Sequence, residues 1–149
     1  MKNKIIHCFL FALILIASIV YIVFSHYSVE LKYIMLIFSL ISTVISVGVS
    51  QLIFKFFLKV FSLFEENEWP VLLTTFYSYL LLNILFLFAI QNIFDDITIV
   101  SIFSPMLVIY LSGLVCFFKK KHPLRKIIGA TTAFYLFNVL FSLVGVFMK

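Results

Sequence analysis

Charged residues are scarce in this chain of 149 residues. Only 11% of them are Asp, Glu, Lys or Arg and 64% are apolar, whereas soluble domains carry roughly 25% charged residues. Water is therefore not the main solvent of this protein. Cysteine is also scarce, because Cys8 and Cys116 are the only two and both lie in apolar segments. Without paired, spaced cysteines, a domain built on disulfides is excluded.

The sequence also lacks the signatures of catalysis. Its apolar runs contain no paired carboxylates, and the chain has no Gly-rich phosphate loop, no nucleophile elbow and no His-Glu-x-x-His motif. No apolar run has a charged residue near its middle, where proton relays and ion-coupled pumps need one. We therefore expect a protein that is not an enzyme and that binds no cofactor.

Candidate metal ligands gather at one end of the apolar runs, but their spacing argues against a metal site. They are His7, Cys8, Cys116 and His122. His7 and Cys8 are adjacent, so on a helix they point about 100° apart. Neither a CxxC nor an HxxxH pair is present, and we expect no bound metal.

Long apolar runs are what the chain has in abundance. There are five, at about 5–24, 33–54, 70–92, 97–118 and 127–148. Each run is near the ~20 residues that a helix needs to cross a bilayer. A membrane barrel would instead show alternating strands of about 10 residues. The first run lacks a small-x-small cleavage site, which favours a retained span over a secretion signal. The predicted fold is an all-α, polytopic transmembrane helical bundle with five spans, forming one domain over 1–149.

The distribution of basic residues predicts the orientation of these spans. With the N-terminus cytoplasmic, nine of the 11 Lys and Arg residues fall on the cytoplasmic side, and only Lys32 and Lys149 fall outside. Short cytoplasmic loops retain Lys and Arg in this way. Because five spans are an odd number, the C-terminus is predicted to be external.

The second run continues into a basic and aromatic stretch, 55–64, which predicts an interfacial extension of the helix. Lys55 and Lys59 are four residues apart, so they share one helical face and can reach lipid headgroups. An acidic turn follows and ends at Trp69, which is placed as an interfacial anchor rather than a ligand contact. Pro70 then suits the first turn of the third helix.

Two amides, Asn83 and Asn138, fall near the centres of the third and fifth spans. With Tyr79, Tyr135 and Ser46 we expect them to form an intramembrane polar layer inside the bundle. One interpretation is hydrogen bonding between packed helices, at about 0.6 kcal/mol for each bond. The other is the lining of a path for a polar or amphiphilic substrate. Packing is favoured, because small and amide residues are common packing groups in membranes.

The strongest charge feature is the basic turn at 119–126. Its cations are Lys119, Lys120, Lys121, Arg125 and Lys126. We expect them to set the topology and to contact anionic lipid, at about 1 kcal/mol for each basic residue near a charged surface. Nucleic acid is not an expected partner of so short a turn. The acidic turn lies on the same side, and pairs between the two turns are expected to be exposed and weak.

Two stretches carry a resemblance to a known family. Residues 51–79, where a helix and a polar turn lead through Pro70 into the third span, resemble the middle region of the Ypt-interacting protein (Yip) family membrane domain. Residues 109–130 resemble its fourth span, basic turn and fifth span. The family has no established catalytic residues. Its bacterial members are associated with resistance to peptide toxins and with export, so the resemblance implies an immunity or accessory role.

The predicted function is that of a non-enzymatic, multi-pass protein of a bacterial cell membrane, which acts through protein or lipid contacts. Immunity to a membrane-active peptide, or service as an accessory subunit of an exporter, are the forms expected. The alternative is a small transporter or flippase subunit for a polar or amphiphilic substrate. The expected partners are the lipid bilayer, its anionic lipids, and a membrane protein partner or further copies of the chain.

Overall fold

The computed structural model describes residues 2–24, 29–91 and 105–147, and the side chains of 3–24, 31–89 and 106–140. All regular structure in these ranges is helical. The elements are α1 (Lys2–Val23), α2 (Val29–Val60), the short 3₁₀ helix η1 (Glu66–Glu68), α3 (Trp69–Gln91), α5 (Pro105–Phe118) and α6 (Leu124–Phe147). The all-α prediction is confirmed for this part of the chain.

Three of the described helices are long and apolar enough to cross a membrane, at Asn3–Val23, Leu31–Val60 and Glu66–Ala89. A further apolar helix, Met106–Phe118, is shorter. It is the described part of the predicted fourth span, whose first residues, 97–104, lie outside the described residues. These helices support association of the protein with a membrane.

The second helix begins and ends four residues earlier than the predicted span with its extension, 33–64. It begins at Val29 and runs without interruption to Val60, so the predicted extension is the last part of one continuous helix. Residues 61–64 of that prediction lie beyond the helix end. There, Ser62 adopts a left-handed backbone with φ of 56°. The N–H of Leu63 donates to the Leu58 carbonyl at 2.7 Å and that of Ser62 to the Lys59 carbonyl at 3.0 Å, the paired bonds of a Schellman end.

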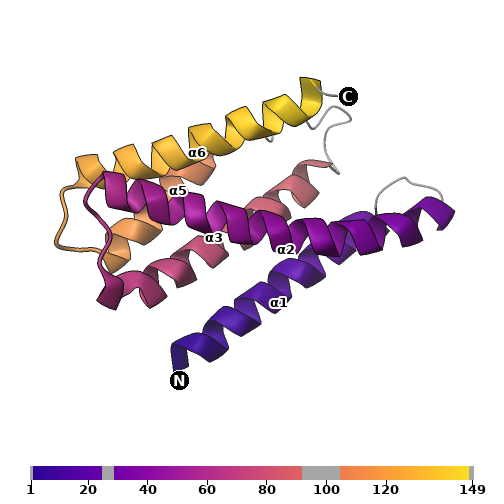
Figure 1. Ribbon diagram of the computed structural model, residues 1–149, viewed down its shortest axis with the longest axis horizontal. Coiled ribbons are helices and arrows are strands. Elements are labelled where there is room, and N and C mark those ends of the chain that lie inside the picture. The colour runs from indigo at the N-terminus through magenta and orange to yellow at the C-terminus, as the bar shows by residue number, and fades with distance from the viewer. Residues whose placement is uncertain (1, 25–28, 92–104, 148–149) are drawn as a thin grey trace.

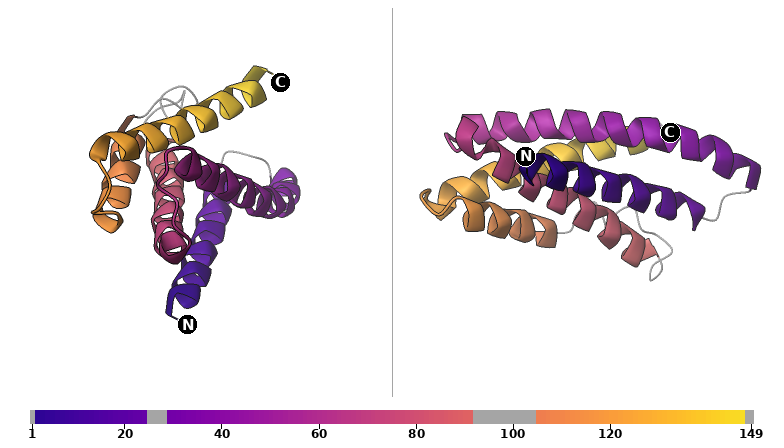
Figure 2. Two further views of the ribbon diagram at one scale, coloured as in Figure 1. Left: turned by 60° about the vertical axis from the view of Figure 1, so that its left-hand side comes forward. Right: turned by 90° about the horizontal axis from the view of Figure 1, so that it is seen from below.

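The helices pack in a chain of neighbours. α1 contacts α3 and α2, α3 contacts α5, α5 contacts α6, and α6 returns to α2. The end of α2, the start of α3 and the turn between α5 and α6 gather at one end of the molecule (Figures 1 and 2). We call this the lysine-rich end, since it carries Lys55, Lys59 and the basic turn.

Three phenylalanines hold the centre of the bundle. Phe54 of α2 lies with its ring centroid 5.3 Å from those of both Phe76 of α3 and Phe134 of α6. All three side chains are fully buried. Aromatic pairs at this spacing contribute about 0.5–1.5 kcal/mol beyond the area that they bury, so this trio joins the three helices that meet there.

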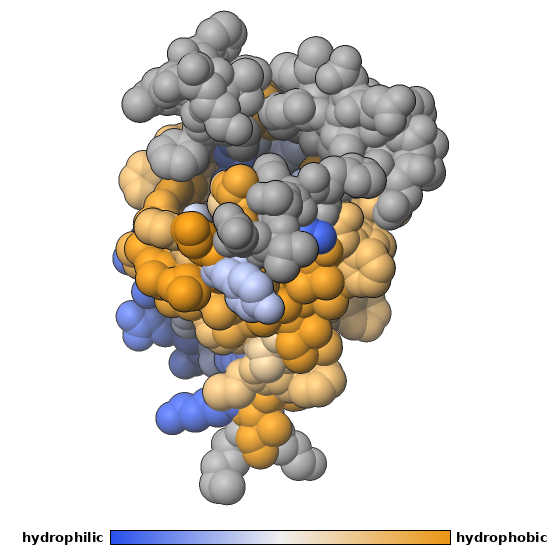
Figure 3. Space-filling model, turned by 90° about the vertical axis from the view of Figure 1, so that its right-hand side faces the viewer, coloured by the Kyte–Doolittle hydropathy of each residue, from blue (hydrophilic) through white to orange (hydrophobic). Residues whose placement is uncertain are grey.

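The outer surface is mostly apolar. Large hydrophobic side chains are exposed along all the described helices, among them Ile16, Phe38, Leu52, Leu85, Ile109 and Leu140. Figure 3 shows this apolar surface on one side of the molecule. Contiguous exposed apolar patches of this extent are rare in soluble monomers and mark contact with a membrane or a partner.

Candidate functional site

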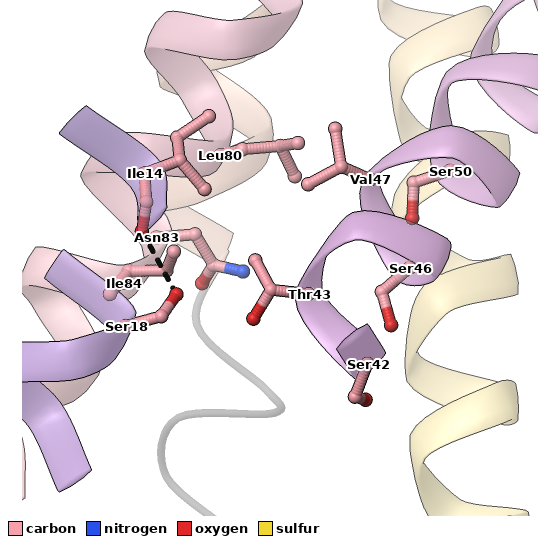
Figure 4. Close-up of a pocket in the computed structure, with 10 residues that line it drawn as sticks. All are labelled: Ile14, Ser18, Ser42, Thr43, Ser46, Val47, Ser50, Leu80, Asn83 and Ile84. Carbon is pink, nitrogen blue, oxygen red and sulfur yellow. Dashed lines mark hydrogen bonds between the residues drawn. The ribbon is translucent and has the colours of Figure 1, made fainter. Parts of the chain in front are cut away.

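A groove with a volume of about 230 Å³ lies between α1, α2 and α3. Figure 4 shows the Asn83 amide extending from α3 toward Thr43 of α2, with Ser18 of α1 beside it. The Ser18 hydroxyl donates to the Ile14 carbonyl at 2.9 Å. Among the described residues, the Asn83 amide makes no hydrogen bond. The remaining lining residues are Ser42, Ser46, Val47, Ser50, Leu80 and Ile84.

The groove continues away from the lysine-rich end. A second hollow of about 250 Å³ shares Ser18, Thr43 and Ile84 with it and extends past Ser39 to Leu87. These two residues lie nearer the far ends of α2 and α3 than the Asn83 groove does. The combined groove therefore runs from the middle of the bundle toward the end opposite the lysines.

Hydrogen bonds between the helices lie between this groove and the lysine-rich end. The Tyr77 hydroxyl of α3 donates to Gln51 Oε1 of α2 at 3.3 Å. His7 of α1 donates from Nε2 to the Pro70 carbonyl at 2.8 Å, and the same nitrogen lies 3.0 Å from Thr74 Oγ1. These contacts join all three helices that line the groove, on the side of the groove nearer the lysine-rich end.

A separate cavity of about 340 Å³ lies on the other side of α2, against α6. Its polar lining is Ser46, Ser50 and Asn138. Asn138 donates from Nδ2 to the Phe134 carbonyl of its own helix at 2.9 Å. Ser46 and Ser50 line both this cavity and the Asn83 groove. The two amides thus lie on opposite sides of the serine-bearing part of α2.

The residues predicted to form one polar layer are accordingly divided between several places. Ser46 accompanies Asn83 in the groove and Asn138 in the cavity. Tyr79 is only 3% exposed and its ring packs on Phe134, with centroids 6.0 Å apart, so it belongs to the core. Tyr135 is partly buried and packs against the same core.

Lys119 corrects the predicted set of lipid-contacting residues. Its side chain is only 1% exposed, and its ammonium donates to the carbonyl of Leu63. It lies 3.1 Å from a carboxylate oxygen of Glu68 and 3.6 Å from one of Glu65. The prediction that Lys119 contacts anionic lipid is wrong, because the acidic turn after α2 covers it. The other predicted cations, Lys120, Lys121, Arg125 and Lys126, are exposed.

His122 extends this charged cluster. Its Nε2 lies 3.3 Å from Glu65 Oε1 and 3.5 Å from the ammonium of Lys119. The hydrogen bond with His122, and then the positive charge of Lys119, lower the pKa of Glu65 below its ordinary value. We call Glu65, Glu68, Lys119 and His122 the charged clamp, since they join the turn after α2 to the turn after α5. In the described ranges, no three His, Cys, Asp or Glu side chains are grouped to hold a metal ion.

No protein-family model, no curated protein and no solved structure matches this chain. The resemblance to the Yip family therefore stays a prediction from the sequence. The interpretation of the groove and of the charged clamp rests on their geometry.

Proposed function

We propose that this chain is a five-span protein of the cell membrane, with a cytoplasmic N-terminus and an external C-terminus. Three described helices with the length and apolarity of membrane spans support this proposal. Further support comes from the lysine-rich end, because basic residues are retained on the cytoplasmic side. In this orientation the hydrogen-bonded side of the groove faces the cytoplasm, and its other end faces outward.

Within this framework, the groove between α1, α2 and α3 binds the polar part of an amphiphile that enters from the outer half of the membrane. The observation that carries the proposal is the Asn83 amide, which extends into a groove lined by both hydroxyl and apolar side chains and makes no hydrogen bond among the described residues. An amide without a partner in hydrocarbon costs several kcal/mol. A backbone or side-chain group of a bound amphiphile would supply the missing bond.

A membrane-active peptide is the amphiphile that we propose, and immunity to such a peptide is the resulting function. A peptide in a membrane offers both apolar side chains and amide groups, which match the mixed lining of serines, Thr43, Leu80 and Ile84. The protein acts by binding and not by catalysis. An accessory subunit of an exporter of such peptides would bind the peptide in the same groove. Both roles agree with what the resemblance to the Yip family implies.

One observation favours the alternative of a transporter or flippase subunit. Ser46 and Ser50 line both the groove and the cavity beside α6, so polar groups continue around α2 from Asn83 to Asn138. A translocation path for a polar substrate would use both sides of the helix.

The same substitution at the two amides separates these functions. Asn83→Leu and Asn138→Leu change equivalent groups on opposite sides of α2, so each serves as the control for the other. The variants are expressed in a sensitive bacterium that is challenged with a panel of membrane-active peptides. Survival is measured together with the thermal stability of each purified variant.

If the groove binds the peptide, Asn83→Leu abolishes protection while Asn138→Leu retains it at equal folded protein. Loss of activity in both variants at unchanged stability supports a path around α2. The proposal fails if activity falls in each variant only in proportion to the folded protein, because the amides would then serve packing alone.

A further inference from the structure

Two lysines at the lysine-rich end lie near the ring of Phe64, and one of them also lies near the ring of Trp69. The ammonium of Lys55 lies 4.9 Å from the ring centroid of Phe64 and 5.4 Å from that of Trp69. The ammonium of Lys59 lies 5.3 Å from the same Phe64 ring. The two rings are themselves in contact, with centroids 5.6 Å apart. We call these four side chains the aromatic shelf.

Among the described residues, no carboxylate pairs with the lysines of this shelf. Neither Lys55 nor Lys59 forms an ion pair within the described part of the chain. The carboxylates of Glu65 and Glu68 are close in sequence, but both are held by Lys119 in the charged clamp. Two like charges four residues apart on a helix repel each other, so an external anion would stabilise the shelf.

We infer that the aromatic shelf binds the phosphate group of an anionic membrane lipid. Aromatic faces attract cations, so the Phe64 ring attracts both ammoniums and the Trp69 ring attracts that of Lys55. In the inferred complex, one lipid phosphate beside the Phe64 ring accepts a hydrogen bond from each of the two ammoniums, which lie 4.9 Å and 5.3 Å from that ring's centroid. The inference rests on the membrane placement given under the proposed function.

The surroundings of the shelf favour a lipid over a free phosphate ion. Phe56 and Val60 lie on α2 beside the two lysines, and their side chains are 60% and 59% exposed. They offer an apolar surface to acyl chains next to the charged site. Trp69 supplies an interfacial aromatic, a residue type enriched at the level of the headgroups. A lipid can occupy both parts, whereas an inorganic ion can occupy only the charged one.

Trp69 is the only tryptophan in the chain, and its fluorescence therefore reports on the shelf alone. The protein is reconstituted in phosphatidylcholine vesicles that contain a minor fraction of brominated phosphatidylglycerol or, in parallel, of brominated phosphatidylcholine. Bromine quenches tryptophan on contact, so the ratio of the two quenching efficiencies measures the preference for the anionic lipid. We expect a preference of roughly fivefold or more, from two basic residues near one headgroup.

The double substitution Lys55→Gln and Lys59→Gln is expected to bring this ratio to about one. The substitutions Lys120→Gln and Lys121→Gln remove the same charge from the exposed basic turn and should leave the ratio high. Arginine at positions 55 and 59 keeps the charge and stacks on aromatic rings, so it should preserve the preference. The inference is overturned if the wild type gives a quenching ratio near one. It is also overturned if the double glutamine variant at positions 55 and 59 gives the same ratio as the wild type.

Two further outcomes concern the source of the phosphate and the membrane placement. In detergent without lipid, inorganic phosphate should not change Trp69 fluorescence, and a saturable change would assign the site to a soluble ion instead. If neither brominated lipid quenches Trp69 in the vesicles, the proposed membrane placement itself fails. Equal quenching by both lipids leaves that placement intact and rejects only the shelf.

Discussion

The ammonium of Lys119 lies 3.1 Å from the carboxylate of Glu68, and this ion pair joins the end of α5 to the start of α3. The Glu68 oxygen in the pair is buried and makes no hydrogen bond within the described residues. The positive charge of Lys119 is therefore the main interaction that offsets the burial of this Glu68 oxygen. Because the two residues belong to separate turns, the pair holds the lysine-rich end together.

Replacement of Lys119 by Met should destabilise the protein. The change leaves Glu68 without a counter-charge and the Leu63 carbonyl without its donor. The cost should be roughly 1–3 kcal/mol, less than for a fully buried pair because the Glu68 side chain is 34% exposed. Thermal unfolding in detergent measures it. The exposed neighbour provides the control, since Lys120→Met should change stability by less than about 0.5 kcal/mol. Equal effects of the two substitutions would contradict the charged clamp.

Acid should weaken the clamp through Glu65. The hydrogen bond with His122 and the charge of Lys119 lower its pKa from the ordinary value of 4.5, so the folded state favours the carboxylate. This stabilisation is present above pH 4.5 and is lost as the pH falls through the lowered pKa. The Tm of the wild type should therefore fall below pH 4.5 more steeply than that of Glu65→Gln. Parallel pH profiles would show that Glu65 has no part in the acid response.

The end of α2 should tolerate glycine better than serine. Ser62 has a φ of 56°, a left-handed conformation that costs an L-residue roughly 1–2 kcal/mol and costs glycine little. Ser62→Gly should therefore raise the free energy of unfolding by about 1 kcal/mol. Ser62→Ala keeps the Cβ and should give no gain. Chemical denaturation of the two variants side by side tests this, and a gain with alanine would point to the hydroxyl instead.

The apolar runs predicted the helices of the described fold but not all their ends. Hydropathy reports which residues suit lipid, whereas a helix ends where its last carbonyls find other donors. At the end of α2 those donors are the N–H groups of Ser62 and Leu63. Serine is not the usual residue for such an end, so this end could not be predicted from the residue type. Pro70 was more informative, because a proline in the first turn is a common start of a helix.

The candidate sites were predicted in part. An amide within an apolar run is unusual, and this signal led to Asn83 and Asn138. Their separation by α2 depends on packing between distant segments and could not be inferred from depth alone. The burial of Lys119 has the same cause, because its partner carbonyl at Leu63 is 56 residues away. Because the basic run and the acidic turn lie on the same side of the membrane in the prediction, attraction between them was expected. The sequence did not indicate which lysine would be buried by the acidic turn.

Gly129 should be required for the contact between α6 and the end of α2. A Cβ placed there would lie 2.7 Å from Cε1 of Phe61, too close for the ring to stay in position. Gly129→Ala should cost about 1–3 kcal/mol, as overpacking usually does. At Gly113 a Cβ meets nothing within 4 Å, so Gly113→Ala should be neutral or slightly stabilising. Adding Phe61→Leu to Gly129→Ala should recover stability if the clash is the cause, and thermal unfolding compares all three.

Cysteine labelling should locate the two sides of the protein. In a background with Cys8→Ser and Cys116→Ser, single cysteines replace Lys121 in the basic turn and Asp96, which lies outside the described residues. The excess of basic residues predicts that the turn is cytoplasmic and that Asp96 is external. A membrane-impermeant maleimide should therefore label position 96 in whole cells, and position 121 only after permeabilisation.

This result also bears on the direction of the groove. Because the groove extends away from the lysine-rich end, a cytoplasmic basic turn directs its other end to the outside. A peptide arriving from outside would then meet the Asn83 groove without crossing the bilayer. If position 121 is labelled in intact cells and position 96 is protected, the orientation is the reverse of the proposed one. The argument for an external ligand then fails.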